Sequence, residues 1–258
     1  MNPLTLWLLG WLLIALTLSG VWLVQTRTRN AGIVDVFWPL SIGAAGVLYA
    51  MLASGSGFAR LCLALLAAAW SLRLGGYLAL RNLGQAEDAR YAKLREQWGT
   101  QVNARMFVFF QIQALAGAAL SLSMLAAAGH ADSGDGQILI GVAVGALGVL
   151  GEAAADAQLA RFKSDPANRG RVCKYGLWRY SRHPNYFFES VFWCAFPILA
   201  WGAPQAWLGF VGPVLITFFL LKFTGVPATE EHARRSRGAE YEDYLRTTSR
   251  FIPWLPKK

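Results

Sequence analysis

Apolar residues dominate the chain in seven stretches, each close to the length that crosses a lipid bilayer. A transmembrane helix needs about 20 consecutive, mostly apolar residues. The first stretch has no basic N-terminal flank and is longer than the core of a signal peptide, so we expect it to remain as a span. The pattern predicts an all-α, polytopic membrane protein with seven transmembrane helices at residues 4–24, 32–52, 60–80, 107–128, 137–158, 185–202 and 205–223.

Basic residues lie in alternate connections between these stretches. They gather after the first, third, fifth and seventh stretches, whereas the other connectors are short and nearly free of Lys and Arg. The positive-inside rule then predicts that the N-terminus lies outside and the C-terminus in the cytoplasm. The net charge of +9 follows the topology, so we do not expect nucleic-acid binding.

The composition narrows the class of protein. With 55% hydrophobic and 15% charged residues, the chain is too apolar for an ordinary soluble domain of 258 residues. Cys62, Cys173 and Cys194 are too scattered to predict a disulfide framework or a metal site. No linker separates a second domain, so we expect one domain over residues 1–258.

Basic and aromatic residues are concentrated in one stretch, residues 168–189, NRGRVCKYGLWRYSRHPNYFFE. Arginine can bind phosphate through two parallel hydrogen bonds, and aromatic side chains can stack on flat rings. A phosphorylated nucleotide suits this mixture, although a cytoplasmic loop with topogenic charge would also explain it. The sequence lacks a predicted strand followed by the glycine-rich motif that binds dinucleotides in Rossmann folds. Nucleotide binding would therefore depend on helices and loops. The basic members of the stretch are Arg169, Arg171, Lys174, Arg179 and Arg182.

Acidic residues interrupt the later apolar stretches near their cytoplasmic ends. Glu152 and Asp156 are four residues apart and share one helix face, and Asn185 and Glu189 repeat this spacing. Charged groups at membrane depth normally face the helix bundle and have partners. The pattern predicts either a polar cavity open to the cytoplasm or a set of structural ion pairs.

A second group of polar residues lies in the second and third stretches. Trp38 follows Asp35 by three residues, while Trp70 precedes Arg73 by three and Tyr77 follows it by four. These side chains could converge on a flat apolar substrate and polarise its carbonyl group. The same aromatic residues could equally serve packing or a membrane-interface belt.

After the last apolar stretch, the tail predicts a cytoplasmic helix from about residue 230 to residue 247, ending before Pro253. Its dense polar cluster could close a cofactor cavity from below, or the helix could lie on anionic lipid.

In the apolar stretches, closely spaced glycines predict close helix contacts. These glycines are Gly43, Gly46, Gly141, Gly145, Gly148 and Gly151.

Three segments together carry a resemblance to a known family: ADAQLARFKSDPANRG, GLWRYSRHPNYFFE and EEHARRSRGAEYEDYLRTTSRFIPW. They resemble the bacterial, DUF1295-like branch of the membrane steroid 5-alpha-reductase family, which has a 3-oxo-5-alpha-steroid 4-dehydrogenase C-terminal domain. The resemblance runs from about Val34 to Pro256. It implies an oxidoreductase of the bacterial inner membrane that uses NADPH to reduce the carbon-carbon double bond of a 3-oxo-4-ene steroid or similar polycyclic enone. We expect a monomer in contact with membrane lipid, without a metal ion.

The resemblance also assigns roles to residues, with the cofactor-binding part at about residues 152–258. Where eukaryotic relatives have a catalytic glutamate and tyrosine, this chain has Phe37 or Trp38 and Trp70. We therefore assign catalysis to the nearby Asp35 and Tyr77, and substrate contact to Trp38 and Trp70. The expected cofactor-binding residues are Arg73, Asp156, Lys163, Arg171, Tyr180, Arg182, His183, Asn185, Tyr186, Glu189, Glu230, His232, Arg234 and Arg235.

Two other functions remain open at this stage. The RHPNY motif and the tail also resemble isoprenylcysteine carboxyl methyltransferases, which use S-adenosylmethionine. That cofactor has no phosphate groups, so it would leave the loop arginines unexplained. A non-catalytic lipid-binding protein would explain the basic loops but not the acidic residues at membrane depth.

Overall fold

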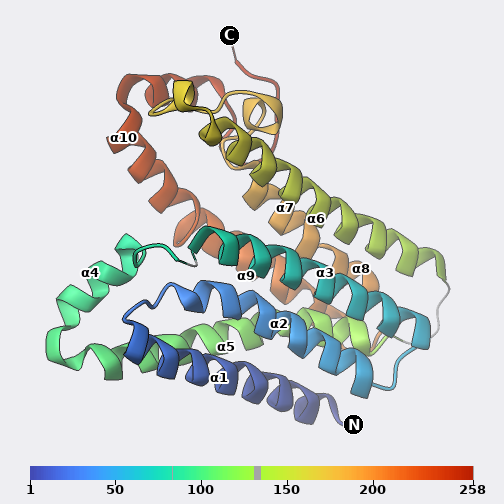
Figure 1. The fold of residues 1–258 in the computed structure, drawn as a ribbon. Coiled ribbons are helices and arrows are strands. Elements are labelled where there is room, and N and C mark those ends of the chain that lie inside the picture. The colour runs from blue at the N-terminus through green and yellow to red at the C-terminus, as the bar shows by residue number, and fades with distance from the viewer. Residues whose placement is uncertain (83, 131–134, 258) are drawn as a thin grey trace. The chain divides into compact units, whose positions relative to one another are not determined.

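A computed structural model describes residues 1–82, 84–130 and 135–257, and these contain helices and no strand (Figure 1). The chain divides into two compact units, Met1–Leu139 with Phe196–Gly212, and Ile140–Ala195 with Pro213–Lys258. The expected cofactor-binding part falls largely in the second unit. Among the described residues, six helical segments are long and apolar enough to cross a membrane: Pro3–Thr28, Ile33–Leu52, Gly57–Asn82, Ala89–Ala128, Asp135–Ser164 and Ala206–Thr247.

In the first unit, long apolar helices pack side by side, shown from blue to green in Figure 1. The second helix contacts the first, the third and the fifth. A short polar helix, α4, and a 3-10 turn, η1, connect the third helix to the fifth. The elements are α1 (Pro3–Thr28), α2 (Ile33–Leu52), α3 (Gly57–Asn82), α4 (Ala89–Trp98), η1 (Gly99–Gln101), α5 (Val102–Ala128) and η4 (Ala206–Phe210).

The second unit combines apolar helices with a polar C-terminal helix, α10. The polar helix α10 bends at Gly238, whose backbone has a φ of 52° and a ψ of −128°. Because α10 is polar, the apolar part of the last candidate span lies in η4 and α9. The elements wholly or largely in this unit are α6 (Asp135–Ser164), η2 (Pro166–Asn168), η3 (Gly176–Arg179), α7 (Pro184–Trp193), α9 (Val211–Lys222) and α10 (Val226–Thr247). Helix α8 (Ala195–Leu199) belongs to the first unit except for its first residue.

The stretch expected to form the sixth span, residues 185–202, is broken. It forms α7, of 10 residues, and α8, of 5 residues, and each is shorter than the roughly 20 residues that a spanning helix needs. Pro197 provides a physical reason, because it has no N–H to donate to the carbonyl of Trp193, the last residue of α7. The described residues therefore contain six candidate spans, and the seventh crossing and the orientation remain predictions.

Close helix contacts occur at four of the glycines that the sequence singled out. A Cβ atom on Gly43 of α2 would lie 2.1 Å from Ser71 Oγ and 2.9 Å from the Ala67 carbonyl oxygen, both in α3. A Cβ atom on Gly46 would lie 2.9 Å from the Ala67 Cβ atom. In the second unit, a Cβ atom on Gly148 or Gly151 of α6 would meet the aromatic residues of α7 at 2.5 Å or less. The expected close packing is confirmed at these positions.

We predict that Gly43→Leu lowers the free energy of unfolding by about 1–3 kcal/mol, because the backbone of α3 leaves no room for a side chain. Gly76→Leu in α3 is the matched control, since no atom lies within 4 Å of a Cβ atom at that position. Thermal unfolding in detergent, followed by circular dichroism, compares the two variants. Equal melting temperatures would contradict the close contact at Gly43.

Candidate functional site

The loop after α6 is shaped by local polar contacts. Asp165 Oδ1 accepts a hydrogen bond of 2.9 Å from the Ala167 N–H and caps η2. Asn168 Nδ2 donates to the Phe162 carbonyl oxygen at 3.0 Å, which ties the loop back to α6. Gly170 has a φ of 79°, a left-handed conformation that favours glycine. These contacts turn the segment 164–171 over the end of α6.

This loop borders a cavity of about 510 Å³ in the second unit. Four basic residues line the cavity, Lys163, Arg169, Arg171 and Arg237, against a single acidic one, Asp165. Arg237 reaches it from α10, where its Nε donates to the Arg171 carbonyl oxygen at 3.0 Å. The volume lies within the range of small-molecule pockets.

The charge of this cavity favours an anionic ligand. Within residues 1–82, 84–130 and 135–257, the side chains of Arg169, Arg171 and Arg237 form no ion pair. Like charges around one cavity repel one another, and an anion bound between them would relieve the repulsion. Of the expected cofactor residues, Lys163 and Arg171 are brought together here.

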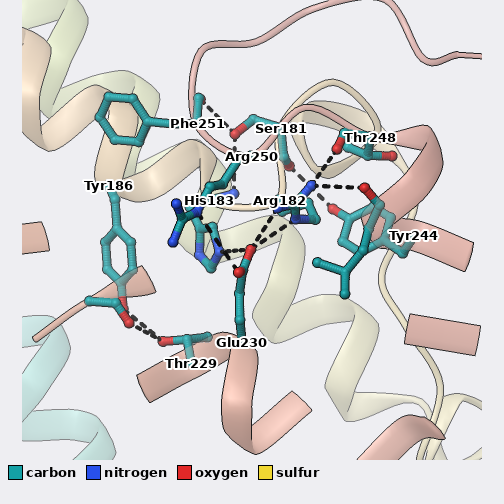
Figure 2. Close-up of polar contacts among 12 residues, drawn as sticks. Ser181, Arg182, His183, Tyr186, Thr229, Glu230, Tyr244, Thr248, Arg250 and Phe251 are labelled. Carbon is teal, nitrogen blue, oxygen red and sulfur yellow. Dashed lines mark hydrogen bonds and ion pairs between the residues drawn. The ribbon is translucent and has the colours of Figure 1, made fainter. Parts of the chain in front are cut away.

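A second cluster is centred on the Glu230 carboxylate of α10 (Figure 2). Arg182 donates to Glu230 Oε1 from Nε at 2.9 Å and from Nη2 at 2.8 Å. The ring nitrogen Nε2 of His183 lies 3.3 Å from the same oxygen, and Arg250 Nε lies 3.8 Å from Oε2. We call these four residues the Glu230 cluster.

The guanidinium group of Arg182 donates four hydrogen bonds to the protein. Besides binding Glu230, its Nη1 donates to the Thr248 carbonyl oxygen at 2.6 Å and to the Leu245 carbonyl oxygen at 3.2 Å. Its backbone N–H donates to the Ser249 carbonyl oxygen at 2.8 Å. Arg182 is buried, so this arrangement satisfies a charge that would otherwise be costly to bury. We call residues 169–183, between η2 and α7, the central loop. Arg182 therefore holds the end of α10 against the central loop.

The ring of His183 is packed as well as hydrogen-bonded. It stacks on Tyr186 with ring centroids 5.4 Å apart, and the Tyr186 hydroxyl lies 3.3 Å from Thr229 Oγ1 (Figure 2). Burial lowers the pKa of His183, an effect that Glu230 opposes and the neighbouring guanidinium groups reinforce. His183 is therefore expected to be neutral near pH 7.

The same cluster sets the ionisation of Glu230. Burial raises the pKa of this carboxyl group, but the hydrogen bonds from His183 and Arg182 and the charge of Arg182 outweigh it. The resulting pKa is about 2, below the ordinary value of 4.5. Glu230 is thus a carboxylate at every physiological pH.

Asn185 and Glu189 both lie in α7, four residues apart and therefore on one face of the helix. Asn185 Nδ2 donates to Asp156 Oδ1 of α6 at 3.1 Å. Trp193 Nε1 donates to Glu189 Oε1 at 2.9 Å. The Asp156 and Glu189 side chains are both buried. The contact between Asp156 and Asn185 joins two residues that we expected in the cofactor site.

Asp35 in the first unit is bound to the polar helix α4. Its carboxylate accepts hydrogen bonds from Arg90 Nη2 at 3.0 Å and from the Tyr91 hydroxyl. Glu87 lies just before this helix and pairs with Arg95 at 2.9 Å. Helix α4 was not identified in the sequence, although Asp88 caps its N-terminus and Gly99 ends it.

The other expected site residues of the first unit have different surroundings. Trp70 is completely buried, and Trp38 donates its indole N–H to the Gln113 carbonyl oxygen at 2.9 Å. The guanidinium groups of Arg73 and Arg81 lie 5.6 and 5.9 Å from the centre of the Tyr77 ring. These distances allow cation–π interactions, so Tyr77 lies in a cationic environment.

Several expected cofactor residues lie on exposed surface. Arg235 pairs with Glu231 along α10, and Arg234 reaches Glu242 at 3.5 Å across the bend at Gly238. His232 and Tyr180 are also exposed. Such exposed pairs contribute little to stability.

Arg169 and Arg237 were not among the expected site residues, although both lay in basic segments of the sequence. Arg169 is two residues from Arg171, so the density of charge around it was a usable local signal. Arg237 is 66 residues from Arg171 and meets it only through the fold. The sequence contained no local signal for that contact.

We predict that Glu230→Gln lowers the free energy of unfolding by roughly 3 kcal/mol, because it leaves the buried Arg182 charge without its counter-ion. Glu231→Gln removes the neighbouring, exposed carboxylate and should cost less than about 1 kcal/mol. Thermal unfolding of the two purified variants measures the difference. Similar stabilities would show that the Glu230 cluster does not hold the second unit together.

Acid should destabilise the second unit in two steps. The pKa of His183 is lowered on folding, so the unfolded chain binds a proton more readily and stability should fall as the pH drops through the ordinary value of 6.5. The pKa of Glu230 is also lowered, so its contribution should be lost as the pH falls from 4.5 to about 2. His183→Gln should flatten the first step, measured as melting temperature against pH. An unchanged profile would contradict the assignment to His183.

Comparisons with known proteins identify a family but no individual relative. No curated protein and no solved structure matches the chain. The model of the DUF1295 family, described as a protein of unknown function, matches residues 21–248. Since the match covers most of the 258 residues, the chain belongs to the DUF1295 family.

Proposed function

We propose that the protein is an NADPH-dependent reductase that acts on the carbon-carbon double bond of a 3-oxo-4-ene steroid or similar polycyclic enone. DUF1295 is associated with steroid 5-alpha-reductase-like membrane proteins. The observation that carries the proposal is the basic cavity of the second unit, with Lys163, Arg169, Arg171 and Arg237 along its wall.

The basic cavity suits NADPH, which carries phosphate groups, better than S-adenosylmethionine. NADPH has a pyrophosphate and a 2′-phosphate, and guanidinium groups bind phosphate oxygens through paired hydrogen bonds. S-adenosylmethionine has no phosphate and carries a positive charge at sulfur, so four basic side chains would disfavour it. The cavity therefore supports the reductase over the methyltransferase.

We assign the chain's residues as follows. Lys163, Arg169, Arg171 and Arg237 bind the phosphates, and the Glu230 cluster positions the loop that precedes α7. Bound NADPH supplies a hydride for the beta carbon of the enone. Tyr77, or Asp35 in its protonated form, polarises the substrate carbonyl by donating a hydrogen bond, and water delivers the proton to the alpha carbon.

We place the enzyme in the bacterial inner membrane as a monomer. The proposed topology has seven crossings, in which α7 and α8 together form the sixth. The N-terminus then lies outside and the C-terminus in the cytoplasm, as the distribution of basic residues indicates. This orientation gives the basic cavity access to cytoplasmic NADPH.

Binding to detergent-purified protein tests the proposal, with NADPH, NADH and S-adenosylmethionine titrated in parallel. We expect NADPH to bind most tightly. Lys163→Ala and Arg171→Ala should each weaken it about tenfold to a hundredfold, since a hydrogen bond to a charged group contributes about 1.5–3 kcal/mol. NADPH oxidation with a 3-oxo-4-ene steroid then measures turnover.

Arg246→Ala is the matched control, because it removes an exposed positive charge of α10 whose partner is Asp243. It should leave NADPH affinity unchanged. A response to S-adenosylmethionine alone, or equal NADPH affinity in all three variants, would overturn the proposed function.

A further inference from the structure

The last nine described residues, 249–257, form a segment that we call the C-terminal strap. It follows the polar helix α10, yet it exposes large apolar side chains. Ile252 is 63% exposed, Trp254 is 70% exposed and Leu255 is 73% exposed. Apolar side chains gathered on the surface of a polar region mark an interaction site.

The strap is fixed to the central loop rather than loose. The Trp254 N–H donates to the Tyr180 carbonyl oxygen at 2.9 Å, and Ser181 Oγ donates to the Phe251 carbonyl oxygen at 2.7 Å (Figure 2 shows the second contact). At its end, the Lys257 N–H donates to the Thr247 carbonyl oxygen at 2.8 Å. The backbone is therefore held in place while its apolar side chains remain uncovered, so the exposure is a built feature of this unit.

The charge around the strap indicates the partner. Lys257 lies within it, exposed Arg179 lies next to Tyr180, and the strap contains no acidic residue. Arg250 also lies within it, although its guanidinium group is 3.8 Å from Glu230. Tryptophan with neighbouring basic residues is typical of segments at a membrane interface, where the indole ring lies at the level of the headgroups. Basic residues are attracted to the anionic lipids of such a surface.

We propose that the C-terminal strap inserts Ile252, Trp254 and Leu255 into the interface of an anionic phospholipid bilayer. The apolar helices already hold the chain at the membrane, so this second contact with the same bilayer is favoured by a high effective concentration. Through its bonds to Tyr180 and Ser181, the inserted strap holds the loop that contains Arg182 and His183. This inference does not depend on the reductase activity.

A fluorescent probe tests the insertion in full-length protein in nanodiscs of phosphatidylcholine and phosphatidylglycerol. The three native cysteines are changed to Ala, and Trp254→Cys is labelled with an environment-sensitive fluorophore. Ala239→Cys, at an exposed position of α10, is the matched control. We expect nitroxide-labelled phospholipid to quench the probe at position 254 several-fold more strongly than the probe at position 239, while aqueous iodide shows the opposite order.

Two results would overturn the proposal. Equal lipid quenching at the two positions would show that the strap does not enter the bilayer. Protection of position 254 from both quenchers would show that a second copy or another protein covers it.

A photo-crosslinker provides an independent readout in a chain that keeps its native cysteines. With benzoylphenylalanine in place of Trp254, irradiation should yield phospholipid adducts, detected by mass spectrometry. Crosslinked protein without lipid adducts would contradict the insertion.

Discussion

The ion pair between Arg182 and Glu230 is the interaction on which the arrangement of the second unit depends. Arg182 precedes α7, Glu230 lies in the first half of α10, and the carbonyl groups that Arg182 also binds lie where α10 ends. One buried guanidinium group thus joins the segment before α7 to the beginning and the end of α10, which is distant from it in sequence. Burying this charge would be unfavourable without the carboxylate, so the three segments are expected to come together as one cooperative unit.

The arginines of the central region have two different environments. Arg182 is buried, and its donors are used by protein acceptors, so its contribution is structural. Arg169 and Arg171 are exposed to the basic cavity and remain available to a ligand. Sequence spacing alone placed them in one class. The fold separates them, because Arg182 binds the Glu230 carboxylate, whereas Arg169 and Arg171 form no ion pair with a described residue.

The sequence predicted what depends on local pattern. Apolar length located the long helices, polar composition located the end of α10, and glycine spacing located the contacts at Gly43 and Gly148. It did not predict the break between α7 and α8, because the stretch is apolar on both sides of Pro197. Nor did it predict the approach of Arg237 to the basic cavity, since that contact depends on how α10 folds back over a distant loop.

The bend at Gly238 fixes the helical phase between the two halves of α10. The first half directs Glu230 toward Arg182, and the second directs the Tyr244 hydroxyl to the carbonyl oxygens of Trp178 and Ser181. An α-helix turns by about 100° per residue. Inserting one residue near the bend would therefore rotate one half relative to the other, and the two anchors could not both be satisfied. The length of α10 is thus constrained as strictly as its composition, although half of its residues are exposed.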